Sequence, residues 1–221
     1  PLYSHIQMTN NSGLIKARNV IATIKGKTIP NEKIVVGGHL DSWDLATGAM
    51  DNGIGSFSVL DMARTFKALK LQPARTIDFV MFMGEEEGLL GSRAYVDEAI
   101  KDKSIDQIRY MLNYDMTNDP KGYHTSDADS KELFESIGKI ASQLDSNFKN
   151  TFSVGAGLHS DHQPFMLHGV PTGGGAGGSL PKGAGPLVDE ASQKIKDQFG
   201  MEKFYEIAKL NFKNIDKIKK I

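Results

Sequence analysis

Residues 35–53 contain the runs Val35-Val36-Gly37-Gly38-His39-Leu40-Asp41-Ser42-Trp43-Asp44 and Gly48-Ala49-Met50-Asp51-Asn52-Gly53, and they decide the fold. The first run begins with apolar residues that do not alternate with polar ones, which is typical of a strand covered on both faces. It ends on a histidine and an aspartate, and Asp51 stands just before a helical pattern. We interpret this stretch as the first half of a metal site.

Length and composition favour a single α/β domain over residues 1–221, because domains of this class commonly reach this size. The chain has 26 Lys and Arg residues against 27 Asp and Glu residues. This balance gives no reason to expect a nucleic-acid partner, and a small uncharged or mixed-charge substrate fits it better. The chain contains no cysteine, so His, Asp or Glu side chains have to hold any metal ion.

The sequence lacks the patterns of membrane insertion and export. No apolar run approaches the roughly 20 residues that a membrane-spanning helix requires. The start at Pro1 has neither the basic region nor the apolar region of a signal peptide. We therefore expect no membrane span and no signal peptide in this chain, and the sequence leaves the oligomeric state open.

Hydrophobic periodicity divides the chain into alternating strands and helices. Short apolar runs bounded by turn residues predict strands at 19–25, 33–38, 76–83, 108–114 and 151–154, with a further strand entry at 169–172. Apolar residues three to four positions apart predict helices at 54–69, 89–100, 130–144 with Ser130 as N-cap, 161–167, 188–199 and 202–218. Residues 173–185 are rich in glycine and predict a loop. The alternation predicts an α/β sandwich with a mostly parallel central sheet flanked by helices.

Candidate metal ligands follow three of the predicted strands. In open parallel sheets, the carboxyl ends of the strands form the rim where ligands bind. Asp51 would face the same rim, because it precedes the helix that follows the first of these strands. The strand-end candidates are His39 and Asp41, Glu85 and Glu86, and Asp115.

Each of these groups alone has an ordinary explanation, as a surface hydrogen-bonded pair, a solvated acidic turn or a cap. Their joint position changes the interpretation, because carboxylates a few ångströms apart repel each other unless a cation lies among them. Carboxylates with one imidazole suit zinc, manganese or cobalt. Two such ions about 3.5–4 Å apart can share a bridging carboxylate and activate a water molecule as a nucleophile.

The same residues carry a resemblance to a known family. From about residue 19 to about residue 178, the chain resembles the M28 zinc exopeptidases, which include bacterial aminopeptidases and carboxypeptidase Q-like dipeptidases. The matching segments are Gly38-His39-Leu40-Asp41-Ser42-Trp43-Asp44, Gly48-Ala49-Met50-Asp51-Asn52-Gly53, Gly84-Glu85-Glu86-Glu87-Gly88-Leu89-Leu90-Gly91-Ser92, Asn113-Tyr114-Asp115-Met116 and Ser160-Asp161-His162-Gln163-Pro164-Phe165.

The resemblance implies a role for each candidate. The implied metal ligands are Asp51 as the bridge between two ions, His39 and Asp115 on one ion, and Glu86 on the other. Glu85 would be the general base, taking a proton from the metal-bound water and passing it to the leaving amine. Asp41 would orient His39 and raise its basicity.

The resemblance also implies a fold, an activity and a location. It implies a three-layer sandwich, the phosphorylase/hydrolase-like zinc peptidase fold. It implies a metal-dependent exopeptidase, an aminopeptidase or dipeptidase, that hydrolyses small peptides with a water activated by two zinc ions, or by manganese or cobalt. It further implies a secreted or periplasmic protein. Two alternatives are a single-zinc transferase similar to glutaminyl cyclases, and a non-enzymatic homologue that has lost metal ligands.

One position of the family pattern has no match. The family places a further histidine ligand of the second metal in a late segment, and none of the six histidines of this chain follows Gly173. Three explanations stay open. The segment lies outside this sequence, another histidine such as His159 or His162 takes its place, or the second metal site is weak and activity is reduced or lost.

Overall fold

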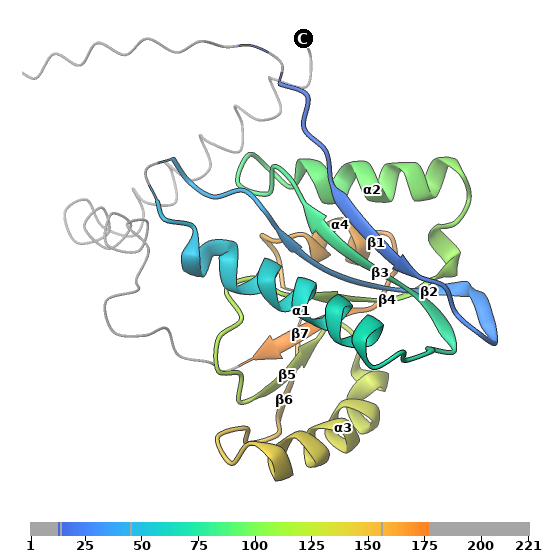
Figure 1. Ribbon diagram of the computed structural model, residues 1–221, viewed down its shortest axis with the longest axis vertical. Helices are drawn as coiled ribbons and strands as arrows, with labels where there is room; N and C mark the ends of the chain where they lie inside the picture. Colours follow the sequence, from blue (N-terminus) through green and yellow to red (C-terminus); the bar gives the residue numbers. More distant parts are fainter. Residues whose placement is uncertain (1–12, 14, 45, 156, 177–221) are drawn as a thin grey trace, which may run out of the picture.

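The computed structural model describes residues 13, 15–44, 46–155 and 157–176, which form a seven-stranded sheet with helices on both faces (Figure 1). The strands are β1 (Val20–Ile24), β2 (Ile29–His39), β3 (Arg75–Phe82), β4 (Ile108–Asn113), β5 (Gly122–Thr125), β6 (Thr151–Val154) and β7 (Thr172–Ala176). The α-helices are α1 (Ile54–Ala68), α2 (Leu90–Lys101), α3 (Lys131–Leu144) and α4 (His162–Leu167). Three short helical turns are η1 (Ala49–Gly53), η2 (Ile105–Gln107) and η3 (Ala128–Ser130).

The sheet has parallel strands at its centre. The strand order is β1-β3-β2-β4-β7-β5-β6, with β2 parallel to both β3 and β4, and β4 parallel to β7. β1 and β3 are antiparallel, as are β5 and β7. The predicted α/β sandwich with a mostly parallel sheet is therefore confirmed. Because β2, β3 and β4 are parallel neighbours, their carboxyl ends lie side by side.

Two apolar layers separate the sheet from its helices. Val36 and Phe79 pack with Val59 of α1 on one face. Tyr110 of β4 also contacts Phe134 of α3, with ring centroids 5.7 Å apart. The opposite face packs against α2 and α4, and its buried core includes Val35, Val80, Phe82, Val96, Met111 and Phe165. Successive strand residues alternate between these layers, as the pleat requires.

β1, β3, β4, α1 and α2 agree with the predicted ranges to within one residue at each end. β2 begins at Ile29, four residues before its predicted start, and the other differences fall in the second half of the chain. β5 has only four residues, and its sequence, Gly-Tyr-His-Thr, gives no apolar run that would predict a strand. Residues 173–176, predicted as loop, belong to β7. Their glycines allow a close approach, since a Cβ at Gly173 would lie 2.7 Å from the carbonyl oxygen of His124. The predicted helices 188–199 and 202–218 lie outside the described residues.

The predicted N-cap is also different. Ser130 precedes α3, but its side chain caps no helical N–H group. Its hydroxyl donates instead to the Asp127 carboxylate at 2.7 Å, and Asp127 accepts from the backbone N–H of Asp129 at 3.0 Å. Asp127 thus caps the short turn η3, which leads into α3. Within the described ranges, no helix is both long and apolar enough to cross a membrane.

Candidate metal centre

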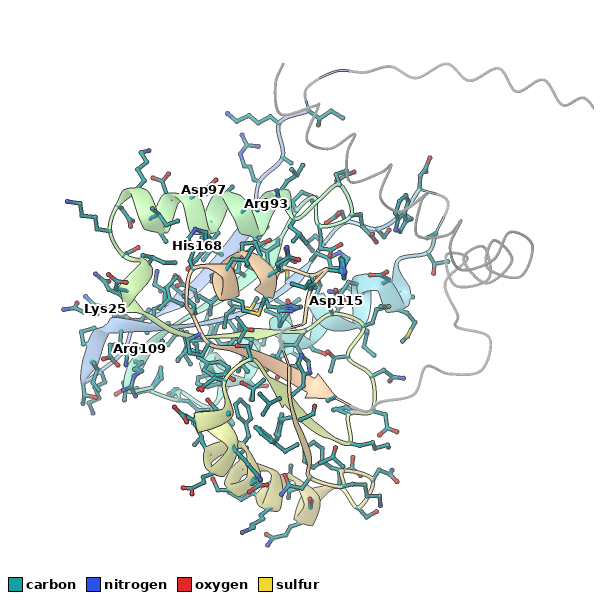
Figure 2. The ribbon with its side chains drawn as sticks, turned by 180° about the vertical axis from the view of Figure 1, so that it is seen from behind. Lys25, Arg93, Asp97, Arg109, Asp115 and His168 are labelled. Carbon is teal, nitrogen blue, oxygen red and sulfur yellow. The ribbon has the colours of Figure 1, made fainter. Side chains whose placement is uncertain are left out.

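The candidate ligands gather where β2, β3 and β4 end. His39 is the last residue of β2, Glu85 and Glu86 follow β3, and Asp115 follows β4. Figure 2 labels Asp115 at this end of the sheet. Asp51 comes from η1, in the connection between β2 and α1. The predicted convergence at one edge therefore follows from the parallel pairing of these strands.

His39 is buried, with both ring nitrogens facing oxygen atoms. Its Nδ1 lies 3.0 Å from the carbonyl oxygen of Asp41, a hydrogen bond in which the ring N–H donates. Its Nε2 lies 3.1 Å from Asp51 Oδ1 and 3.5 Å from Asp115 Oδ1. Among the described residues, Nε2 makes no hydrogen bond of good geometry. The ring therefore presents Nε2 to two carboxylates, as a metal-ligating imidazole does.

Glu86 completes a group that can surround a cation. One ligand atom from each of His39, Asp51 and Glu86 lies within 4.8 Å of the other two. His39 Nε2, Glu86 Oε1 and Asp115 Oδ1 are buried and have no hydrogen-bond partner in the described part of the chain. Buried polar atoms without partners are costly, and bound divalent cations would supply partners for them. Asp115 is not a member of the three-residue group, although its Oδ1 lies 3.5 Å from His39 Nε2. One imidazole with carboxylates fits zinc, manganese or cobalt.

Burial and mutual repulsion change the protonation of the site. Burial raises the pKa of Glu85 to about 8, with Asp115 adding to the rise and His39 opposing it. Burial, followed by the charge of Asp51, raises the pKa of Glu86 to about 7. Although burial lowers it, the surrounding carboxylates, Asp115 first, raise the pKa of His39 well above its usual range. Without a cation, protons therefore reduce the negative charge of the site.

Asp41 holds the loop that carries Glu85 and Glu86. Its Oδ1 accepts the backbone N–H groups of Gly84 at 2.9 Å and Glu85 at 3.1 Å, and its Oδ2 accepts that of Glu86 at 3.0 Å. Gly84 has a φ of +80°, which favours glycine at this turn. The Asp41 carboxylate lies 3.7 Å from Nδ1 of His39, whereas the backbone carbonyl oxygen of Asp41 lies only 3.0 Å from the same nitrogen. Its main observed contacts are thus with the loop, and its predicted effect on His39 stays a prediction.

Asn52 joins two loops that carry candidate ligands, a role that sequence reasoning did not assign. Its buried side chain donates to the carbonyl oxygen of Tyr114 at 2.8 Å. Its Oδ1 accepts the N–H groups of Met116 at 3.0 Å and Gly55 at 3.2 Å. A Cβ at Gly55 would lie 2.1 Å from the Tyr114 oxygen, so glycine permits this contact. Asn52 therefore holds the Asp51 turn against the segment that carries Asp115.

Ser160 sets the direction of the Asp115 carboxylate. Its hydroxyl donates to Asp115 Oδ2 at 2.6 Å and accepts from the Asn113 amide at 2.7 Å. Oδ1 of Asp115 is thereby left to face His39. The neighbouring Asp161 is fully buried, neither of its oxygens has a hydrogen-bond partner among the described residues, and burial raises its pKa to about 7. The segment Ser160-Asp161-His162 was the sequence signal for this support.

The structure tests the candidate substitutes for the missing histidine. Nε2 of His162 donates to the carbonyl oxygen of Gly157 at 2.8 Å, and its Nδ1 faces the Asn113 amide at 3.3 Å. Both nitrogens are engaged, so His162 is not placed to bind a metal. The group of described residues that could hold a metal ion does not include His159. No second histidine ligand is therefore present in the part of the chain that the structure describes.

A family model described as Peptidase family M28 matches residues 19–216. The chain belongs to peptidase family M28. Carboxypeptidase Q from Xenopus laevis is 30% identical over 155 residues, which cover 69% of this chain and 32% of that protein. This M28 chain thus spans about a third of the length of the curated relatives that it matches first. The resemblance seen in the sequence is confirmed.

Solved structures of relatives confirm the fold class. A peptidase M28 precursor from Shewanella amazonensis has a TM-score of 0.62 and 29% identity, covering 71% of this chain and 35% of that one. A zinc aminopeptidase from Bacillus subtilis has a TM-score of 0.58 and 29% identity, covering 75% of this chain and 41% of that one. The α/β sheet of this M28 chain is therefore the sheet of known peptidases.

Proposed function

We propose that residues 1–221 form a metallopeptidase catalytic domain of an exopeptidase, an aminopeptidase or dipeptidase acting on small peptides. The observation that carries this proposal is the approach of ligand atoms from His39, Asp51 and Glu86 to within 4.8 Å of one another. Membership of an M28 peptidase family supports it. We further propose that the protein acts outside the cytoplasm, in keeping with a relative that is named a precursor.

The donor set suits zinc, and a Bacillus relative is named a zinc aminopeptidase. In the proposed arrangement, Asp51 would be shared between two ions, His39 and Asp115 would hold one, and Glu86 would hold the other. Such ions supply Lewis acidity, which polarises the scissile carbonyl and lowers the pKa of a water molecule. Manganese or cobalt would supply the same chemistry.

Glu85 is the proposed general base. A catalytic base works best when its pKa lies near the working pH, and burial raises the pKa of Glu85 to about 8. A bound cation would lower this value, because it favours the carboxylate. The carboxylate would accept a proton from the attacking water and deliver it to the leaving amine. Asp41 would keep Glu85 in place through the backbone of its loop.

The test is hydrolysis of amino-acid anilides and dipeptides by the purified chain, with and without added zinc. We expect hydrolysis that a chelator abolishes and zinc restores. Glu85→Gln should lower kcat by about 10²–10⁴-fold, whereas Glu87→Gln, an exposed neighbour, should not. Metal analysis accompanies the assay, so that a loss of bound metal is distinguished from a loss of the base.

Three results would contradict the proposal. Cyclisation of an N-terminal glutamine without peptide hydrolysis would support a single-zinc transferase. A folded chain that binds no metal would support a non-enzymatic homologue. Full activity of Glu85→Gln would remove this residue from the proposed chemistry.

A further inference from the structure

Asp161 is a buried acidic residue outside the proposed ligand set. It stands directly before α4, is fully buried, and its side chain does not cap that helix. Neither of its carboxylate oxygens has a hydrogen-bond partner among the described residues, and it forms no ion pair with any of them. A buried carboxylate without a partner is costly and rare in native proteins, so its presence here requires an explanation.

The residues on either side hold Asp161 in this position. Ser160 donates to Asp115 Oδ2 at 2.6 Å, and Nδ1 of His162 faces the Asn113 amide at 3.3 Å. Asn113 ends β4, and Asp115 follows it closely. Asp161 therefore lies between two residues that contact the end of this strand, and it does not turn toward solvent.

The surroundings of Asp161 are closed on the side of α2 as well. α2 and α4 pack side by side on one face of the sheet (Figure 1). Ser92, in the first turn of α2, is fully buried and lies next to Asp161. Its hydroxyl donates to the carbonyl oxygen of Leu89 at 3.3 Å. Because α2 begins shortly after Glu86, Asp161 is enclosed between the segments that carry two of the proposed ligands.

Electrostatic interactions connect Asp161 with the metal edge, the edge of the sheet where the candidate ligands gather. Burial raises the pKa of Asp161 to about 7, Asp115 adds to the rise, and His39 opposes it. Burial also raises the pKa of Glu85, and the charge of Asp161 adds to that rise. Without a cation, the negative charge of Asp161 is therefore unfavourable. A cation at the metal edge reverses this sign, because it attracts a buried carboxylate strongly at reduced dielectric.

We propose that Asp161 is a buried counter-charge of the metal centre, which raises the affinity for cations without touching them. This inference rests on the proposed metal site and adds to it a residue that binds no metal. Removing the charge while keeping the shape of the side chain should weaken cation binding, and it should also relieve the metal-free chain of an unpartnered carboxylate. The two effects have opposite signs, whereas loss of a structural contact would weaken both cation binding and folding.

The test is Asp161→Asn, which keeps the shape of the side chain and removes its charge. Zinc affinity, measured by competition with a chromophoric chelator, should fall about 10–100-fold, as is typical when a group that supports a metal ligand from outside is lost. In excess chelator at about pH 8, where the carboxylate is mostly ionised, the melting temperature should equal or exceed that of the wild type. The absorption bands of the cobalt-loaded chain should keep their positions, because these report the ligands and their geometry.

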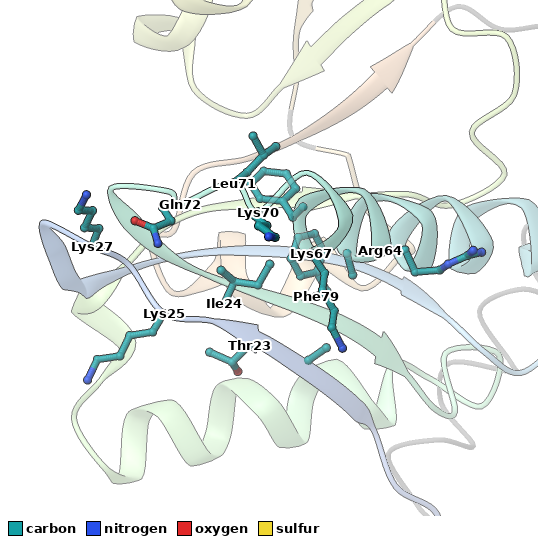
Figure 3. A pocket seen from close by; sticks show the side chains of 13 residues that line it. Thr23, Ile24, Lys25, Lys27, Arg64, Lys67, Lys70, Leu71, Gln72 and Phe79 are labelled. Carbon is teal, nitrogen blue, oxygen red and sulfur yellow. The ribbon is translucent and has the colours of Figure 1, made fainter.

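Two control variants separate charge from structural damage. Gln72→Lys adds the same unit of charge at an exposed position between α1 and β3, at the opposite end of the strands from the metal edge. Figure 3 shows Gln72 near Lys27 beside a groove lined by β1 and α1. This variant should change the zinc affinity less than about twofold, because solvent and salt screen its charge. Ser160→Ala removes the bond to Asp115 and should lower both the zinc affinity and the melting temperature of the metal-free chain.

The possible failures have different readouts. Unchanged zinc affinity in Asp161→Asn would overturn the counter-charge and leave the proposed metal site in place. A parallel fall in zinc affinity and in the melting temperature of the metal-free chain would assign Asp161 a structural role instead. Displaced cobalt bands would show that the residue acts on the coordination geometry rather than through its charge. A wild-type chain that binds no zinc would overturn both the metal site and this inference.

Discussion

Substitution of Asp41 by asparagine tests whether this carboxylate holds the Glu85–Glu86 loop. The side chain is 12% exposed and accepts three backbone N–H groups. In Asp41→Asn, one oxygen still accepts the N–H groups of Gly84 and Glu85, while the new NH₂ group faces the N–H of Glu86. The loss is one hydrogen bond to a charged acceptor, which is about 1.5–3 kcal/mol.

The expected effect on stability follows from this figure. A domain of about 150–250 residues loses about 2–4 °C in melting temperature for each kcal/mol. A loss of about 2 kcal/mol therefore lowers the melting temperature by about 4–8 °C. The measurement is thermal unfolding in excess chelator, so that metal affinity does not contribute.

The matched control is Asp61→Asn, which makes the same chemical change at an exposed position of α1. It should shift the melting temperature by less than 2 °C, since surface changes are usually within about 0.5 kcal/mol. Zinc affinity, measured separately, should fall in Asp41→Asn because the loop carries Glu86. If the two variants have the same melting temperature and the same zinc affinity, other contacts hold the loop and the reasoning is wrong.

Three further predictions concern the cation, a buried ion pair and a close contact. Zinc at about 100 times its dissociation constant should stabilise the chain by about 2.7 kcal/mol, and a variant with Glu86→Gln should gain less in the same melting assay. Burial raises the pKa of Asp78, but hydrogen bonds from Thr23, Lys33 and Tyr95 outweigh it and lower the pKa below its usual value. The contribution of Asp78 to the free energy of unfolding is therefore present above about pH 4. It is lost as the pH falls through the lower pKa of the folded state. Asp78→Asn should therefore be less stable by about 2 kcal/mol at pH 7, and urea titrations should show this difference shrinking below about pH 4; a constant difference would contradict the assignment. Gly55→Ala should lower stability by about 1–3 kcal/mol, because its Cβ would lie 2.1 Å from the Tyr114 oxygen, and an unchanged denaturation midpoint would show that the segment moves away freely.

Sequence patterns predicted the part of the site that depends on strand ends. His39, Glu86 and Asp115 follow apolar runs. Parallel pairing brings the carboxyl ends of these strands to one edge of the sheet, and this does not depend on the side chains of the segments that connect them. β5 was not predicted, and β7 was predicted only as a strand entry ending at residue 172, because four residues without an apolar run and a glycine run have no periodicity of their own. They become strands because they pair with neighbouring strands, and a local sequence pattern carries no information about that pairing.

The supporting contacts were not predictable for a related reason. Asn52 and Tyr114 are 62 positions apart, and Ser160 and Asp115 are 45 apart. In each case a polar side chain from one loop bonds to another loop, so its role exists only in the folded chain. A sequence motif can mark such a residue, as the segment beginning at Ser160 did, without indicating which atom it contacts.

These contacts together bear on how the site responds to a cation. Two side chains from the segment between β2 and α1 hold the neighbouring loops. Asp41 bonds to the loop after β3, and Asn52 bonds to the loop after β4. These protein contacts hold the backbone that carries the candidate ligands and keep the carboxylates close to one another. Burial, to which the neighbouring carboxylates add, raises the pKa values of Glu85 and Glu86. Cation binding at this preorganised edge should therefore displace protons more than it orders the chain, in contrast to metal sites that form only as the protein folds.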